Sequence, residues 1–203
     1  AAPMMDDAQH LAKVIGARVR RLRLSQQLTL DQLSDRADIS RRALVNVEQG
    51  AVNPSVGTLL QISDALGIGL PSLVAPPSPK PVSVTRAGDG PILWTGEHDG
   101  RGRLVAGTEP PDVVELWDWS LGPGDRHASE AHSAGTKELI QGREGQVILD
   151  VSDQSITLNA GDAVSFPGDV THAYANPGAE PAAFVLAVFE PGVGSTTTEV
   201  SHG

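Results

Sequence analysis

The sequence predicts an α+β protein with two domains, a helical N-terminal domain and an all-β C-terminal domain. Apolar residues between 11 and 74 recur at intervals of three, four and seven, the spacing of one face of an α-helix. Beyond residue 82, short alternating apolar and polar segments are separated by Gly, Pro, Asn and Asp clusters, which is typical of a β-barrel or sandwich. Residues 75–81 (APPSPKP) hold four prolines and predict an extended spacer. The expected divisions are a helical domain at 8–74, a linker at 75–81, a β-domain at 82–191 and a flexible tail at 192–203.

Charge divides unevenly along the chain, whose net charge is −10. Residues 10–50 carry eight basic and four acidic side chains, whereas residues from 76 onward carry seven basic and 18 acidic ones. A locally basic segment in an acidic chain favours a polyanion-binding module attached to a domain with another task.

Composition also limits the chemistry and the location of the protein. The chain has no cysteine, so a bound metal must be held by His, Asp, Glu or water. No segment approaches the roughly 18 uninterrupted apolar residues that a membrane span needs. We therefore expect a cytoplasmic protein with no membrane partner.

Two short helices joined by a tight turn are predicted between residues 29 and 49. Thr29 followed by Gln32 fits a capping box that starts one helix, and Ser40 offers an N-cap for the next. Asp38 lies between them and is one of the few residue types that tolerate a positive φ. This arrangement is the geometry of a helix-turn-helix.

Polar residues gather on one arc of the second helix, at about 100° per residue. The arc holds Arg41, Arg42, Asn46 and Gln49, side chains that can contact base edges and phosphates. An alternative is that the arginines form a solvated face on a helical protein-interaction domain.

The segment at 28–68 resembles the lambda-repressor-like, XRE-type helix-turn-helix family. The resemblance implies a five-helix bundle whose recognition helix starts at Ser40, and it implies double-stranded DNA as a partner. Together with the polar arc it predicts the DNA-binding residues Thr29, Ser40, Arg41, Arg42, Asn46, Gln49 and Asn53. Three residues depart from the usual family pattern, namely Leu30, Ser34 and Asp38.

Two segments of the β-domain, 124–145 and 161–176, resemble the two cupin motifs, which implies an antiparallel β-barrel of the jelly-roll type. The first motif is matched by Gly124, Glu130, His132, Glu138 and Gly145. The second is matched by Gly161, Pro167, Asp169, His172 and Asn176. Glu130 replaces the usual first histidine, the gap between His132 and Glu138 is one residue longer than usual, and Asp169 replaces a turn glycine.

The resemblance leaves two histidines and one carboxylate, His132, Glu138 and His172, as candidate ligands for a divalent metal such as Zn, Fe, Mn or Ni. Glu130 could supply a fourth ligand. An alternative is that these side chains only bind an effector or water. The remaining histidines, including His127 and His98, are expected to be solvated.

Strand alternation in VVELWDWSL places Trp117 and Trp119 on one face, where they could form an aromatic wall of an effector pocket. The alternative is ordinary core packing of each tryptophan.

The order of the two domains resembles the XRE-cupin regulators, and within them the sulfur-utilisation regulators. This resemblance implies a homodimeric transcription regulator, not an enzyme, in which a small-molecule effector or a metal alters the DNA affinity. One alternative is a metal-dependent cupin enzyme, an oxygenase or isomerase, that carries a DNA-binding domain. Another is a structural partner protein without DNA affinity.

Overall fold

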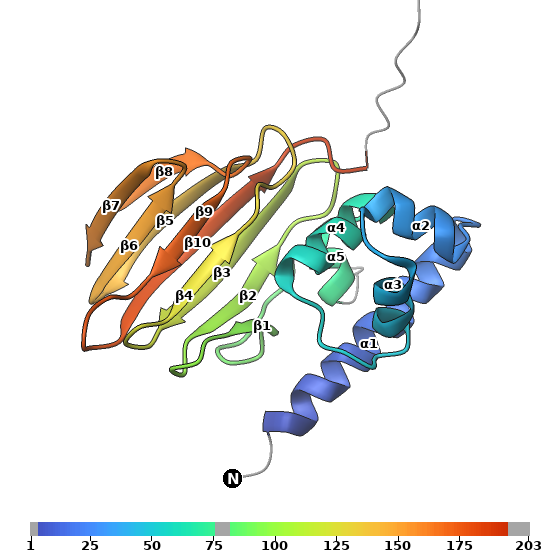
Figure 1. Cartoon of the computed structure of the whole chain (residues 1–203), viewed down its shortest axis with the longest axis horizontal. Helices are drawn as coiled ribbons and strands as arrows, with labels where there is room; N and C mark the ends of the chain where they lie inside the picture. Colours follow the sequence, from blue (N-terminus) through green and yellow to red (C-terminus); the bar gives the residue numbers. More distant parts are fainter. Residues whose placement is uncertain (1–3, 76–81, 195–203) are drawn as a thin grey trace, which may run out of the picture.

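The computed structural model describes residues 4–75 and 82–194, which form a helical unit and a β-sheet unit packed against each other (Figure 1). Residues 4–75 contain five α-helices, as the family resemblance predicts. They are α1 (Met4–Ser25), α2 (Leu30–Ala37), α3 (Arg41–Glu48), α4 (Val56–Leu66) and α5 (Gly69–Val74). We call this unit the head.

The caps predicted from the sequence set the turn between α2 and α3. Thr29 Oγ1 accepts a hydrogen bond from the Gln32 backbone N–H at 3.1 Å, and the Thr29 N–H donates to Gln32 Oε1 at 2.9 Å. Asp38 ends α2 with a φ of 53°, in the left-handed region. Ser40 Oγ then accepts from the Ala43 N–H at 3.1 Å and starts α3. The capping box and the tight turn are therefore confirmed, and α2 and α3 form a helix-turn-helix.

Residues 82–194 contain ten β-strands in two antiparallel sheets. The strands are β1 (Ile92–Thr95), β2 (Arg101–Gly107), β3 (Val113–Leu121), β4 (Arg126–Ser129), β5 (Lys137–Glu144), β6 (Gln146–Val151), β7 (Gln154–Asn159), β8 (Ala163–Pro167), β9 (His172–Ala175) and β10 (Ala182–Glu190). One sheet has the order β1-β2-β3-β10-β5-β8 and the other the order β4-β9-β6-β7. We call this unit the β-domain.

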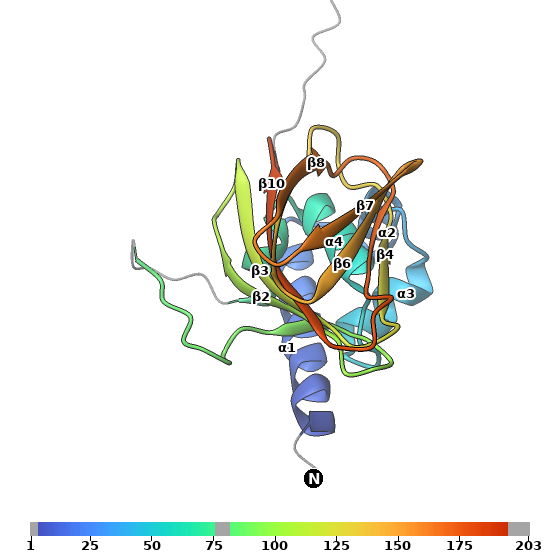
Figure 2. The same ribbon diagram turned by 90° about the vertical axis from the view of Figure 1, so that its left-hand side faces the viewer.

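The inner face of the large sheet follows the alternation predicted for β3. Glu115, Trp117 and Trp119 are buried, whereas Val114 and Leu116, which alternate with them along the strand, are exposed on the outer face. Buried apolar side chains from both sheets belong to one core cluster, which also includes residues of the head. Figure 2 shows the strands of the β-domain in front of the head.

The head packs against one end of the β-domain through α4 and α5 (Figure 1). Glycines allow a close approach, because a Cβ at Gly107 on β2 would lie 2.1 Å from Pro71 Cγ on α5. A Cβ at Gly69 would likewise meet a methyl group of Val113 at 2.8 Å. The Ser72 hydroxyl donates a hydrogen bond to Glu109 across the same contact.

Parts of the predicted linker and tail, residues 76–81 and 195–203, lie outside the described residues. At the start of the predicted tail, Val193 is buried and its N–H donates to the Pro111 carbonyl oxygen at 2.7 Å. Within the described ranges, none of the helices has the length and apolar character needed to cross a membrane.

Candidate functional site

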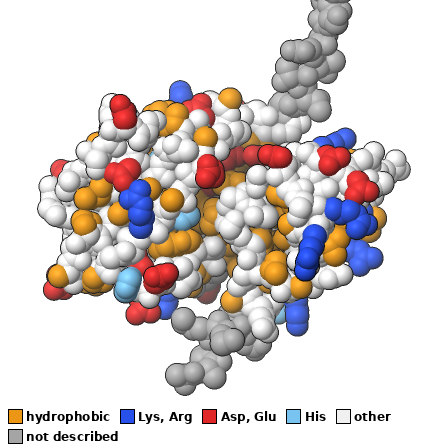
Figure 3. Space-filling view, viewed as in Figure 1, with side chains coloured by type: hydrophobic (Ala, Val, Ile, Leu, Met, Phe, Trp, Pro, Cys, Tyr) orange, Lys and Arg blue, Asp and Glu red, His pale blue; other side chains and the backbone are white. Residues whose placement is uncertain are grey.

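Helix α3, the predicted recognition helix, lies at the surface of the head. Its apolar side is buried through Leu44 and Val47, while Arg41, Arg42 and Gln49 are exposed. Figure 3 shows Lys and Arg side chains gathered over the head and few of them over the β-domain. A basic, exposed helix of this kind can enter the major groove of a DNA duplex.

The other predicted DNA-binding residues lie around this helix. Thr29, Ser40 and Asn53 are exposed, and Asn46 is half-buried. Sequence reasoning missed the ion pair between Arg41 Nε and Asp31 Oδ1, which are 3.0 Å apart with exposed fractions of 62% and 73%. An ion pair so exposed contributes little to stability, so Arg41 can exchange this partner for a nucleic acid at small cost.

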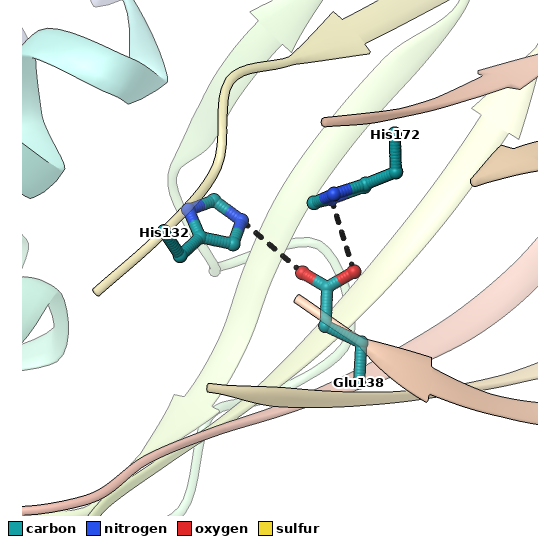
Figure 4. A group of neighbouring side chains, drawn as sticks. All are labelled: His132, Glu138 and His172. Carbon is teal, nitrogen blue, oxygen red and sulfur yellow. Dashed lines mark ion pairs between the residues drawn. The ribbon is translucent and has the colours of Figure 1, made fainter. Parts of the chain in front are cut away.

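The three predicted metal ligands converge inside the β-domain (Figure 4). Glu138 lies between the two histidines: Oε1 is 3.2 Å from His132 Nε2, and Oε2 is 3.1 Å from His172 Nε2. One nitrogen or oxygen atom from each residue lies within 4.8 Å of the others, a spacing that suits ligands around one metal ion. The hydroxyl of Tyr174 also donates to Glu138 Oε2 at 2.9 Å.

Burial would raise the pKa of Glu138, but hydrogen bonds from His132 and His172 outweigh it and lower the pKa to about 2. For His172 burial would lower the pKa, yet the neighbouring Glu138 carboxylate raises it above its ordinary value. The carboxylate therefore stays ionised and attracts positive charge, either protons on the histidines or a metal cation.

The orientation of His172 fits a metal ligand. Its Nδ1 lies 2.8 Å from the Val170 carbonyl oxygen, so Nδ1 carries the proton when the ring is neutral. In the neutral ring the lone pair on Nε2 then faces the Glu138 carboxylate, so this buried atom has no hydrogen-bond partner among the described residues; only the protonated ring donates from Nε2 to Glu138. A cation bound by both Nε2 and the Glu138 carboxylate would give the nitrogen and the carboxylate oxygen a partner.

One departure from the usual cupin pattern has a local explanation. Asp169 Oδ2 accepts a hydrogen bond from the Gly135 N–H at 2.8 Å, which ties together the two loops that lead to Glu138 and His172. Glu130 is exposed and does not belong to the group of converging ligands. The structure therefore does not bring the suggested fourth ligand to the other three.

A small cavity lies next to the candidate metal ligands and has a volume of about 30 Å³. This is room for one or two water molecules or an ion. Trp117 and Trp119 form part of its wall, and helix α4 of the head closes it through Val56 and Leu60. The aromatic wall predicted from strand alternation therefore lines a cavity at the contact between the head and the β-domain.

Sequence reasoning missed several residues of this cavity. His127 was expected to be solvated, but it is half-buried, lines the cavity and has a ring 4.9 Å from that of Trp119. That expectation was wrong because inward-facing strand positions turn His127 away from bulk water, and burial lowers its pKa to about 4. Tyr174 could have been found from strand alternation, since it follows His172 by two residues on β9.

Comparison with known proteins agrees with both units. Residues 19–73 match the helix-turn-helix family and residues 117–189 match the cupin domain family. The chain is 25% identical over 183 residues to the HTH-type transcriptional regulator SutR of Escherichia coli, covering 90% of this chain and 98% of that protein. It is 34% identical over 71 residues to the uncharacterised HTH-type transcriptional regulator y4dJ of Sinorhizobium fredii, covering 35% of this chain and 92% of that protein.

A solved structure shares the whole architecture. The crystal structure of a helix-turn-helix family transcriptional regulator from Vibrio cholerae matches with a TM-score of 0.70 and 24% identity. The match covers 91% of this chain and 99% of that one, and it shows that the two proteins have the same fold.

The head and the β-domain together thus define a DNA-binding helix-turn-helix protein with a cupin domain. The chain belongs to the XRE-type family of HTH transcriptional regulators.

Proposed function

We propose that the protein is a sequence-specific regulator whose cupin domain binds a divalent metal, a small-molecule effector or both, and thereby changes the affinity of the head for DNA. The observation that carries this proposal is the position of the cavity. Candidate metal ligands line the cavity on the side of the β-domain, and helix α4 of the DNA-binding head closes it. A ligand that binds the docked and undocked arrangements differently can therefore alter DNA binding.

In this proposal α3 enters the major groove, where Arg41, Arg42, Asn46 and Gln49 contact base edges. Thr29, Ser40 and Asn53 contact phosphates near the ends of the helices. The domain spans are those predicted from the sequence, 8–74 for the DNA-binding domain and 82–191 for a closed cupin barrel.

His132, Glu138 and His172 would hold the metal, with Zn, Fe, Mn and Ni as candidates for two imidazoles and one carboxylate. The bound ion would supply open coordination positions for an effector. Trp117 and Trp119 would form the apolar wall beside it.

A homodimer is proposed on the outer face of the large sheet. Leu116 and Val114 on β3 and Leu139 on β5 are exposed there, at 41%, 43% and 56%. Ala187 on β10 lies between β3 and β5, in register with Leu116 and Leu139, so apolar side chains are adjacent across the three strands. Burying this surface in a symmetric contact would present two recognition helices to half-sites about one helical turn apart.

The same three ligands would also suit the alternative, a metal-dependent cupin enzyme. The position of the cavity favours regulation, because helix α4 of the DNA-binding head forms part of its wall. We therefore propose a cytoplasmic regulator that is not an enzyme.

The proposal is tested by measuring the metal content of the purified full chain and its operator affinity before and after chelation. Removal of bound metal is expected to change the affinity by roughly 5- to 150-fold. Operator affinity that is the same with and without bound metal, and the same with and without an effector in the cavity, would contradict coupling through the cupin domain.

A further inference from the structure

Tyr174 holds one oxygen atom of the Glu138 carboxylate. Its hydroxyl donates a hydrogen bond to Glu138 Oε2 at 2.9 Å, and the two residues are buried, at 2% and 1% exposed. Tyr174 lies on β9 in the four-stranded sheet, whereas Glu138 lies on β5 in the six-stranded sheet. This buried hydrogen bond therefore joins the two sheets at the candidate metal site.

The ring of Tyr174 is held in place by aromatic neighbours on three strands. Its centroid lies 5.5 Å from that of Trp119 on β3, 5.1 Å from that of Phe184 on β10 and 5.7 Å from that of His172 on β9. A ring packed on several sides in a dense core has few alternative rotamers. The hydroxyl of Tyr174 is therefore directed at Glu138 by the packing around it.

The two oxygen atoms of Glu138 have different partners. Oε1 lies 3.2 Å from His132 Nε2, whereas Oε2 lies 3.1 Å from His172 Nε2 and also accepts from Tyr174. Each histidine donates to Glu138 only when its Nε2 atom carries a proton. A metal ion bound through the two Nε2 atoms would take the place of these protons. Oε1 would then have no donor among the described residues, while Oε2 would keep the hydroxyl of Tyr174.

This difference indicates which oxygen atom would bind the metal. A buried acceptor without a donor costs free energy, so a cation stabilises Oε1 more than Oε2. Hydrogen bonds to the outer atoms of a metal ligand also fix its orientation and raise the affinity of the site. Three single atoms, His132 Nε2, His172 Nε2 and Glu138 Oε1, would then hold the ion and leave its other coordination positions open.

We propose that Tyr174 is a positioning residue of the metal site, whose hydroxyl holds Glu138 Oε2 so that the carboxylate binds the metal through Oε1 alone. This inference rests on the proposed function, because it describes how the chain orders the ligands of the proposed metal. Without the hydroxyl, the carboxylate is free to turn and to offer both oxygen atoms. Tyr174 therefore raises the affinity for the metal and limits the number of protein atoms that contact it.

The effect on affinity is tested with Tyr174→Phe, which keeps the ring and removes the hydroxyl. Binding of Zn²⁺ to the metal-free full chain is measured by competition with a coloured chelator. We expect Tyr174→Phe to weaken Zn²⁺ binding by roughly 10- to 100-fold, the usual effect of losing a group that orients a metal ligand. Binding that is equally tight or tighter in the variant would overturn the proposal.

Phe184→Leu is the matched control for packing. Phe184 is buried beside Tyr174, but it has no polar side-chain atom and does not line the cavity. This variant is expected to lower the free energy of unfolding and to leave the affinity for Zn²⁺ unchanged. Equal losses of affinity in Tyr174→Phe and Phe184→Leu would show that Tyr174 acts only through packing, which would overturn the proposal.

A crystal structure of the unmodified chain with bound Zn²⁺ tests the position of the carboxylate without relying on a variant. Glu138 Oε1 is expected at about 2.0 to 2.2 Å from the ion. Oε2 is expected to remain within hydrogen-bonding distance of the Tyr174 hydroxyl. An ion that contacts both oxygen atoms, or Oε2 in place of Oε1, would overturn the assignment.

The same measurements distinguish failure of this inference from failure of the proposed function. If the unmodified chain binds Zn²⁺ and its operator affinity responds, but Tyr174→Phe behaves identically, only this inference is overturned. If the unmodified chain binds no divalent metal, the metal site of the proposed function is overturned together with it.

Discussion

Arg23 on α1 and Glu48 at the end of α3 form a two-pronged ion pair in the interior of the head. Arg23 Nε lies 2.6 Å from Glu48 Oε1, and Arg23 Nη2 lies 2.9 Å from Glu48 Oε2. Arg23 Nη1 also donates to the Leu28 carbonyl oxygen at 3.0 Å, just before the capping box of α2. The pair is 10% and 7% exposed, so it fixes the position of the recognition helix against α1 and the start of α2.

Glu48→Ala is therefore expected to lower the free energy of unfolding by about 3 kcal/mol, because it leaves the Arg23 guanidinium buried without its counter-charge. Urea denaturation measures the change. Asp31→Ala is the matched control: it removes the exposed pair with Arg41 and should cost less than about 1 kcal/mol. Equal costs for the two variants would contradict the structural role of the buried pair.

Glu138→Gln is expected to abolish stoichiometric metal binding, since it removes the only carboxylate among the three converging ligands. Elemental analysis of the purified variant measures this loss. Glu130→Gln changes the exposed carboxylate that lies outside the group, and its metal content should match that of the unmodified chain. If Glu130→Gln lost the metal as well, Glu130 would have to move inward as a fourth ligand.

The stability of the protein is expected to fall as the pH rises through the range in which Glu190 titrates. Burial is the main cause that raises its pKa from 4.5 to about 9, and the groups facing it are Asp64 on α4, Glu115 on β3 and Glu138 on β5. Between these two values the folded chain holds the proton and the unfolded chain does not. The stabilising effect is therefore complete below 4.5 and is lost as the pH rises toward 9.

Glu190→Gln removes this titration. We expect unfolding free energies similar to those of the unmodified chain at about pH 5, and a more stable variant at about pH 8.5, by about 1 kcal/mol or more. Denaturation at the two pH values measures the difference. A variant that loses the same stability at both pH values would show that the Glu190 carboxyl serves only packing.

Leu139→Glu is expected to convert a dimer into a monomer, because it places a charge in the apolar outer face of the large sheet. Light scattering coupled to size-exclusion chromatography measures the mass. Leu24→Glu is a closely matched control, because Leu24 on α1 is also 56% exposed. Dissociation by Leu24→Glu but not by Leu139→Glu would place the dimer contact on the head.

Much of the fold could be predicted from local signals in the sequence. The capping box at Thr29 and the positive φ of Asp38 depend on residues within one or two turns, and the inward-facing positions of β3 depend on simple alternation. The grouping of His132, Glu138 and His172 could be expected only from the resemblance to cupins, because spacing alone does not show that separate loops converge.

Contacts between the two units could not be predicted from the sequence. Asp64 and Glu190 meet because the head docks on one end of the β-domain, and neither lies in a motif that indicates a partner 126 positions away. The inward turn of His127 and the pairing of Arg41 with Asp31 likewise depend on tertiary packing.

The central claim is that α3 reads DNA sequence, and selection of bound duplexes from a random pool by the full chain tests it most directly. The account predicts enrichment of a motif with two half-sites about one helical turn apart. It also predicts that Arg41→Ala, compared with Arg143→Ala on the β-domain, loses roughly 1 to 3 kcal/mol of discrimination at one position of each half-site. No enriched motif, or the same motif with the same selectivity in both variants, would contradict it.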